Sequence, residues 1–404
     1  MVVSADGALG LYISIPFCRS KCTYCNFASG VYPAGEHARY IDRLVEDLAG
    51  APAWAERMGV ELPRRVDTVY LGGGTPSLLV PELLARLFAG LRAEFDLEPN
   101  AEITVECAPG QLADETLEAL VAAGVNRVSL GVQSFIDCEA RASGRMHNRA
   151  VVLADVMRLH AARIGNLNID LIAGLAGQTV SSWEESLMVM EALADTGVPH
   201  ASVYMLEVDQ DSRLGREVLS AGNRYHADLV PSDDTIARMY ERSIEMLGQA
   251  GLEQYEISNF CRTGKESRHN LRYWQRRPYL GLGLDASSML TASEDHRILR
   301  STTTDDLTAY LAGSEPVETT WLTPAQQHEE AWFLGLRLNA GVDIVAVQRE
   351  FGAEMVSPAL NVVARLVESG LLVFDGKTVR LTAQGRLLSN DVFQEFLGLE
   401  LNQS

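Results

Sequence analysis

The chain has 404 residues, enough for two or three domains that each bury a hydrophobic core. With 47% hydrophobic and 22% charged residues, its composition is that of an ordinary globular protein. Lysine and arginine total 34 against 54 aspartates and glutamates, and the resulting net charge of −20 argues against nucleic acid as a partner.

The N-terminal ten residues lack the basic start and apolar stretch of an export signal. No apolar run reaches the roughly 18 residues that a membrane-spanning helix needs. Cys107, Cys138 and Cys261 are isolated in the sequence, which suits a reducing compartment. We therefore predict a cytoplasmic protein with at most peripheral membrane contact.

The first predicted strand, residues 11–16, leads into a loop that contains Cys18, Cys22 and Cys25. Three thiolates at this spacing can hold three irons of a 4Fe-4S cube, and the fourth iron then remains open to a ligand that is not protein. The alternative is structural zinc, which usually takes four ligands in paired blocks. Because no second block lies nearby, the loop favours a cluster.

Short β-rich runs alternate with helical patterns up to about residue 206. The runs are residues 11–16, 67–74, 101–110, 127–134, 168–175 and 200–207. The stretches between them, such as residues 81–95 and 181–197, space their apolar residues by three and four, as helices do. This alternation predicts an α/β fold with a parallel sheet. We expect a partial (β/α)6 barrel rather than a doubly wound sheet.

The barrel is favoured because polar and glycine-rich residues gather where the predicted strands end, which is where barrel active sites form. These residues are Gly72, Gly73, Gly74, Thr75, Glu106, Gln133, Ser134, Arg145 and Asp170. Alone, the glycine run is explained equally well by a simple turn, and each of the other residues is more often a solvated or locally capped side chain. Together they predict a ring of polar groups that faces the cysteine loop.

Beyond the predicted barrel, residues 207–314 are less regular, and we expect them to form an extension that closes its open side. From residue 315 the pattern changes to helices, then a hairpin with an Asp375-Gly376 turn, then a last helix. This order is typical of a winged-helix-like module. Residues 320–404 hold 6 basic and 10 acidic residues, which argues against DNA binding by that module.

Several motifs in the expected order resemble the radical S-adenosylmethionine proteins related to anaerobic coproporphyrinogen dehydrogenase. They are the cysteine loop, GGGTPS, ITVECAPG, RVSLGVQSF and NIDLIAGLAGQT, within a resemblance that covers roughly residues 10–390. It implies that Cys18, Cys22 and Cys25 hold a 4Fe-4S cluster and that S-adenosylmethionine fills the open iron. The residues implied to hold this cofactor are Tyr12, Tyr24, Gly73, Gly74, Thr75, Glu106, Gln133, Arg145 and Asp170.

Two features favour the haem-chaperone branch of this family over the dehydrogenase branch. The dehydrogenase adds a fourth cysteine where this chain has Phe27, and residues 269–274 resemble the HNxxYW signature of the haem chaperones. The resemblance implies haem as ligand, with His269, Asn270, Tyr273 and Trp274 in contact with it. The alternative is a structural loop in which His269 bonds backbone groups and the aromatic rings pack.

The axial haem ligand stays open, because Ser14 and Ser267 stand where the family often has histidine and cysteine, and Cys261 is an alternative thiolate. The resemblance further implies an acceptor protein for haem and an electron donor such as flavodoxin or ferredoxin. Coproporphyrinogen oxidation and a radical methyltransferase reaction remain alternative activities of the same scaffold.

Overall fold

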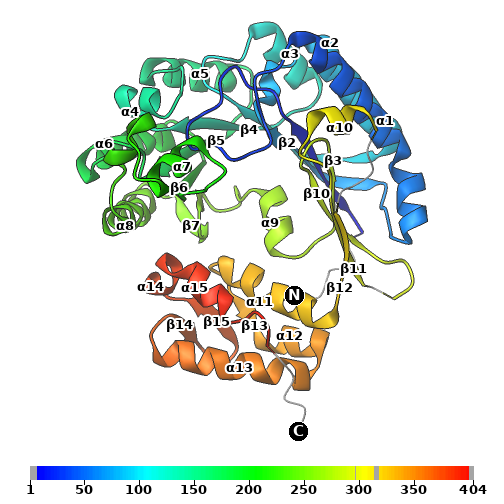
Figure 1. Cartoon of the computed structure of the whole chain (residues 1–404), viewed down its shortest axis with the longest axis vertical. Coiled ribbons are helices and arrows are strands. Elements are labelled where there is room, and N and C mark those ends of the chain that lie inside the picture. Colours follow the sequence, from blue (N-terminus) through cyan, green and yellow to red (C-terminus); the bar gives the residue numbers. More distant parts are fainter. Residues whose placement is uncertain (1–6, 296, 314–317, 400–404) are drawn as a thin grey trace.

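The structure is a computed structural model, and it describes residues 7–295, 297–313 and 318–399. Its main feature is one strongly curved sheet of 12 strands, in the order β12-β11-β10-β9-β1-β2-β3-β4-β5-β6-β8-β7 (Figure 1). The middle of the sheet consists of six parallel strands. They are β1 (Leu9–Ile15), β2 (Arg65–Gly73), β3 (Asp96–Cys107), β4 (Arg127–Gln133), β5 (Asn166–Ala173) and β6 (His200–Met205). The predicted partial barrel is therefore confirmed.

Helices that connect these strands cover the convex face of the sheet (Figure 1). They are α1 (Ala34–Met58), η1 (Pro76–Leu78), α2 (Pro81–Glu94), α3 (Asp114–Ala122), α4 (Asp137–Ala142), α5 (Arg149–Ala161) and α6 (Val180–Asp195). In α1, Tyr40, Ile41, Leu44 and Leu48 are fully buried, and their spacing of one, three and four residues makes one apolar helix face. Packing of such faces on the sheet produces the main hydrophobic core.

Strand alternation gives the sheet two different faces. In β1 the residues Leu9, Leu11, Ile13 and Ile15 are fully buried. Tyr12, between them, lies on the opposite, concave side, where its ring stacks on that of Tyr70 with centroids 6.1 Å apart. Because successive side chains of a strand point to opposite faces, every second residue of β1–β6 reaches the interior of the half-barrel.

Residues 207–314 do not form a separate unit, because they extend both edges of the sheet. Their elements are α7 (Arg213–Leu219), η2 (Arg224–Leu229), α8 (Asp233–Gln249), β7 (Glu253–Glu256), β8 (Asn259–Cys261), α9 (Arg268–Trp274), β9 (Tyr279–Leu282), β10 (Ser287–Thr291), β11 (Ile298–Thr302) and α10 (Leu307–Leu311). Strand β8 pairs antiparallel with β6, whereas β9 pairs parallel with β1. Strand β12 (Glu318–Leu322) pairs with β11, so the sheet continues past the expected boundary at residue 315.

The C-terminal module follows β12 as a separate layer of helices around a small sheet. It comprises α11 (Pro324–Arg337), β13 (Val342–Asp343), α12 (Ile344–Phe351), α13 (Ala353–Glu368), β14 (Leu372–Phe374), β15 (Thr378–Leu381), α14 (Ala383–Leu387) and α15 (Ser389–Gln394). Strands β14 and β15 form the predicted hairpin. The rings of Trp332 and Phe396 stack in the module's own core, with centroids 4.9 Å apart. The helices and the hairpin match the predicted winged-helix-like order.

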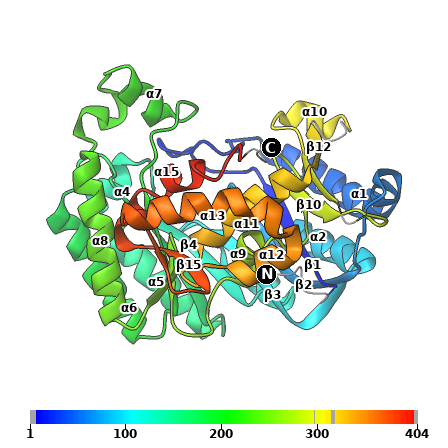
Figure 2. The same cartoon turned by 90° about the horizontal axis from the view of Figure 1, so that it is seen from below.

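The half-barrel is open on one side, and the C-terminal module lies across this opening (Figures 1 and 2). Helix α9 lies inside the concavity, between the sheet and the module (Figure 1), where His269 bonds Thr68 of β2. None of the helices described is both long and apolar enough to cross a membrane. The arrangement leaves enclosed space on the concave side, where the predicted site residues lie.

Candidate cofactor site

The three cysteines of the loop after β1 line one cavity of about 320 Å³ on the concave side of the sheet. All three are free thiols and partly exposed to that space, whereas Cys107 and Cys261 are buried in the protein. Of the other predicted residues, the cavity is lined by Tyr24, Gly73, Gly74, Thr75, Glu106, Gln133, Arg145 and Asp170. The predicted ring of polar groups at the strand ends therefore does face the cysteine loop.

The cysteine loop is held by backbone bonds at both ends. Cys18 N donates to Gly30 O at 2.8 Å, and Thr23 N donates to Ser143 O at 3.1 Å. Hydroxyl groups also lie near two of the sulfurs: Thr75 Oγ1 is 3.9 Å from the sulfur of Cys18, and the Ser29 hydroxyl lies 3.8 Å from the sulfur of Cys25. Hydrogen bonds to sulfur are one of the means by which a protein tunes an iron-sulfur cluster.

Gly74 is where the second strand comes close to the cysteine loop. Its amide donates to Ile15 O at 2.8 Å, and a Cβ atom at this position would lie 2.8 Å from the carbonyl oxygens of both Ile15 and Phe17. No larger residue fits without moving that backbone. Gly73 has φ +99°, which also favours glycine. The glycine run thus lets the end of β2 pack closely against the cysteine loop, and it also forms a wall of the cavity.

Glu106, near the end of β3, is tied to β2 from both oxygens. The hydroxyl of Tyr70 donates to Oε1 at 2.8 Å, and the amide of Gly73 donates to Oε2 at 3.2 Å. Burial raises the pKa of Glu106 to about 7, and the nearby carboxylate of Asp170 adds to the rise. The group is therefore poised to change its charge near neutral pH.

Arg145 and Tyr24 form the cavity wall beside Cys22. Both Nε and Nη2 of Arg145 donate to the hydroxyl of Tyr24, at 3.1 and 2.8 Å. Asp170 lies across the cavity and accepts from Ser129 Oγ at 2.8 Å and from Asn168 Nδ2 at 2.7 Å. A guanidinium group and a carboxylate at one cavity can bind a carboxylate and hydroxyl groups of the same ligand.

Gln133 ends β4 in a left-handed backbone conformation, with φ +69°. Its Oε1 atom is buried and has no hydrogen-bond partner among the described residues. Strained residues with unsatisfied polar atoms gather at ligand sites. Gln133 therefore presents an acceptor that a bound molecule can satisfy.

Three predicted residues do not line the cavity: Gly72 and Ser134 of the ring, and Tyr12, which the resemblance places at the cofactor. Ser134 turns away, because its hydroxyl donates to Glu139 Oε2 at 2.6 Å inside the turn that leads to α4. Tyr12 lies behind Tyr70 and lines a neighbouring cavity with Tyr273 and Trp274. Strand alternation places Tyr12 on the concave face, and its hydroxyl would lie 3.6 Å from a Cβ atom at Gly73, so Tyr12 stands beside the cysteine cavity without lining it.

The HNxxYW segment forms α9, and its histidine does not face a cavity. His269 is fully buried, with Nδ1 3.0 Å from Thr68 Oγ1 and Nε2 2.8 Å from the hydroxyl of Tyr273. Burial lowers the pKa of His269 to about 3. Because both ring nitrogens are engaged, this conformation leaves neither free to bind iron, and a direct contact of His269 with haem stays a prediction.

The other residues of the motif do reach open space. Asn270 and Trp274 line a cavity of about 590 Å³ between the half-barrel and the C-terminal module, and Tyr273 and Trp274 line the cavity beside Tyr12. Ser267, where the family often has cysteine, caps α9 by accepting from Asn270 N at 3.4 Å. Cys261 is buried, and burial raises its thiol pKa to about 12, so it remains a core thiol.

Comparison with known proteins agrees with this geometry. Residues 12–190 match the Radical SAM superfamily, and residues 322–388 match the HemN C-terminal domain. Heme chaperone HemW of Lactococcus lactis is 32% identical over 397 residues, which cover 97% of this chain and 98% of the relative. This chain belongs to the HemW family of radical SAM proteins.

Heme chaperone HemW of Bacillus subtilis is 33% identical over 390 residues, which cover 96% of this chain and 98% of the relative. Among solved structures, coproporphyrinogen III oxidase (HemN) from Escherichia coli superposes with a TM-score of 0.80 over 96% of this chain and 90% of its own. At 24% identity the HemN likeness shows a shared fold only. The HemW-family assignment therefore depends on the sequence relatives.

Membership of this family implies a 4Fe-4S cluster and S-adenosylmethionine, and the residues present fit both. The cavity offers three free thiols in one loop, a strand approach that only glycine permits, and the orphaned acceptor of Gln133. Cys18, Cys22 and Cys25 would hold the cluster. Arg145, Asp170 and Gln133 are placed to hold the carboxylate and hydroxyl groups of the cofactor.

Sequence reasoning missed several side chains that line the same cavity, notably Tyr70, Ser129 and Tyr204. The alternation of side chains along each strand points to these residues in the sequence. Tyr70 pairs with Tyr12 across β1 and β2, and Ser129 pairs with Glu106 across β3 and β4. Reading every second residue of each strand, rather than only the strand ends, would have found them.

Proposed function

We propose that this chain is a cytoplasmic haem chaperone that binds a 4Fe-4S cluster and S-adenosylmethionine and transfers haem to an acceptor protein. The observation that carries the proposal is the identity of 32% and 33%, over nearly the whole chain, with proteins named heme chaperone HemW. Phe27 supports it, since it stands where the related dehydrogenases add a cysteine.

In this proposal the chain's own residues hold and orient the cofactors. Thr75 and Ser29 place hydroxyls near the cluster sulfurs, while Arg145 anchors a carboxylate and Tyr24 fixes the orientation of Arg145. When bound, the cluster and S-adenosylmethionine supply one-electron chemistry. An electron donor such as flavodoxin or ferredoxin would deliver the reducing equivalent.

The haem would lie in the 590 Å³ cavity, which shares Tyr24, Asn26, Ile172 and Tyr204 with the cysteine cavity. The rings of Tyr24, Tyr204 and Trp274 offer flat surfaces for a macrocycle. In this arrangement His269 contributes indirectly, because its bond to Tyr273 fixes the aromatic pair of α9.

A haem titration of the anaerobically reconstituted protein, beside an assay for coproporphyrinogen oxidation, tests the proposal. We expect one haem per chain, transfer of that haem to an apo-haemoprotein, and no oxidation of coproporphyrinogen. Oxidation of coproporphyrinogen without haem binding would mean that the chain is a dehydrogenase and not a haem chaperone. Appearance of S-adenosylhomocysteine with a methylated product would instead indicate a methyltransferase.

A further inference from the structure

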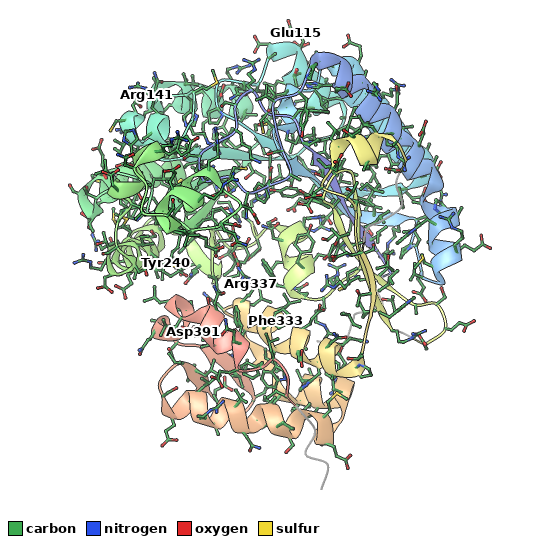
Figure 3. The ribbon with its side chains drawn as sticks, viewed as in Figure 1. Glu115, Arg141, Tyr240, Phe333, Arg337 and Asp391 are labelled. Atoms are coloured by element: carbon green, nitrogen blue, oxygen red, sulfur yellow. The ribbon has the colours of Figure 1, made fainter. Side chains whose placement is uncertain are left out.

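The larger cavity lies between the two parts of the molecule, and each contributes walls. The half-barrel provides residues near the cysteine loop and the end of β6, as well as Asn270 and Trp274 of α9. The C-terminal module provides Arg337, at the end of α11, and residues 387–391. Figure 3 labels Arg337 and Asp391 on the side of the module that is turned toward the half-barrel.

Among the described residues the guanidinium of Arg337 has no hydrogen-bond partner, although it forms an ion pair with Glu256. Its guanidinium lies over the ring of Trp274, 4.2 Å from the centroid. Its nearest carboxylate oxygen, Glu256 Oε2, is 3.7 Å away, beyond hydrogen-bond distance, and its buried Nε has no partner among the described residues. Arg300 is different, since it donates to Tyr279 at 2.6 Å and to Glu330 at 2.9 Å.

Two further polar atoms beside Arg337 also have no hydrogen-bond partner among the described residues. They are Nε1 of Trp274 and Oε2 of Glu256, both buried. Glu256 is fixed through its other oxygen, which accepts from Ser258 N at 3.0 Å and from the side chain of Asn259. Burial raises the pKa of Glu256, and the nearby guanidinium of Arg337 opposes this rise. Native proteins seldom leave buried polar atoms without hydrogen bonds, so three such atoms at one cavity wall are open to a ligand that enters the cavity.

We propose that Arg337 anchors a carboxylate of the bound tetrapyrrole, with the indole N–H of Trp274 as an additional donor. A guanidinium presents paired N–H groups that match the two oxygens of a carboxylate. The propionates of haem provide such carboxylates, as do those of an iron-free coproporphyrin. This inference rests on the proposed function and adds the residue that recognises the edge of the ligand.

The position of Arg337 links recognition to the seating of the C-terminal module. Its carbonyl oxygen accepts from Ile257 N at 3.2 Å, and Asn339 N donates to Tyr255 O at 3.0 Å. These bonds fix the end of α11 against the strand β7. A ligand held by Arg337 therefore contacts both parts of the molecule at once.

Binding of haem, haem dimethyl ester and coproporphyrin III to the reconstituted protein tests the anchor. The ester keeps the macrocycle and the iron, but its esterified propionates carry no charge and cannot form an ion pair with the guanidinium. We expect haem to bind about ten- to a hundredfold more tightly than its ester, the effect of one charge-assisted pair. We expect Arg337→Gln to bind both equally weakly, and Arg337→Lys to recover part of the difference.

Arg300→Gln is the matched control, because it also removes an arginine between the half-barrel and the module, but one whose donors are already used. It should keep the preference for free carboxylates, and circular dichroism should show that every variant is folded. If coproporphyrin III binds more tightly than haem and Arg337→Gln loses this preference, Arg337 binds a carboxylate and the bound tetrapyrrole is the iron-free one. If folded Arg337→Gln still discriminates, the inference is wrong while haem binding stands; if no tetrapyrrole binds, the proposed function fails first.

Discussion

Cys18, Cys22 and Cys25 are partly exposed to one cavity, whereas Cys107 at the wall of the same cavity is buried and Cys138 is exposed on α4. Changing any one of the three to alanine should lower the iron content of anaerobically reconstituted protein from about four atoms per chain to below about one, because the cube loses a ligand. Iron analysis and the brown absorbance measure this. Cys138→Ala is the control and should keep both.

Glu106 makes cofactor affinity depend on pH. Because its pKa is about 7, roughly a tenth of the molecules carry the charged form at pH 6 and nine tenths at pH 8. S-adenosylmethionine is a cation at its sulfur, so its affinity should rise about ninefold over this interval. Isothermal titration calorimetry of wild type and Glu106→Gln measures the effect, and the variant should show a flat profile.

The same pKa has the opposite consequence for the stability of the unliganded chain. Between pH 4.5 and 7 the folded state holds a proton on Glu106 that the unfolded state has released. The free energy of unfolding therefore falls as pH rises through this interval, and Glu106→Gln should remove that part of the slope.

For the affinity experiment the contrary outcome is equally clear. A wild-type affinity for S-adenosylmethionine that does not change with pH would show that Glu106 does not interact with the cofactor's charge.

At the scale of elements, α9 carries the HNxxYW motif and is held in place by buried polar side chains. Its Arg272 is fully buried and bonds Asp67, Thr68 and the carbonyls of Ala8 and Pro278. His269 adds bonds to Thr68 and Tyr273. The helix is thus fixed to the first residues of β1 and β2 by polar side chains, and its aromatic residues are held toward the cavities.

His269→Ala should lower the free energy of unfolding by about 2 to 4 kcal/mol, because it opens a space, leaves the hydroxyl of Tyr273 without its partner and removes one of the two partners of the Thr68 hydroxyl. Asn270→Ala, one residue on, should cost less than about 1 kcal/mol. Urea denaturation measures both. If His269→Ala kept wild-type stability yet lost haem, the histidine would contact haem directly after all.

The sequence predicted local elements well because their signals are local. The alternation of strands and helices and the Asp375-Gly376 hairpin both appear as expected. The orientation of His269 could not be predicted, since it depends on Thr68, some 200 residues earlier. Arg337 is an ordinary helical residue in the sequence, and only the docking of α11 brings it to Trp274 and Glu256.

For the whole molecule, the seating of the C-terminal module depends on a few contacts. Besides the backbone bonds at β7, Arg276 pairs with Glu350 at 2.8 Å and lies over the ring of Phe351. Arg276 is mostly buried, so loss of its partner leaves a poorly solvated charge between the half-barrel and the module. A substitution at this ion pair should weaken the contact between the module and the half-barrel, and neither residue lines the 590 Å³ cavity.

Glu350→Gln should therefore increase hydrogen exchange at the amides of Ile257 and Asn339 by about ten- to a hundredfold, because each opening of the interface exposes them. Bound haem should restore much of the protection, since it contacts both sides of the same interface. Glu368→Gln, an exposed change in α13, is the control and should leave exchange unchanged. Unaltered exchange in Glu350→Gln would mean that the backbone bonds at β7 hold the module without the ion pair.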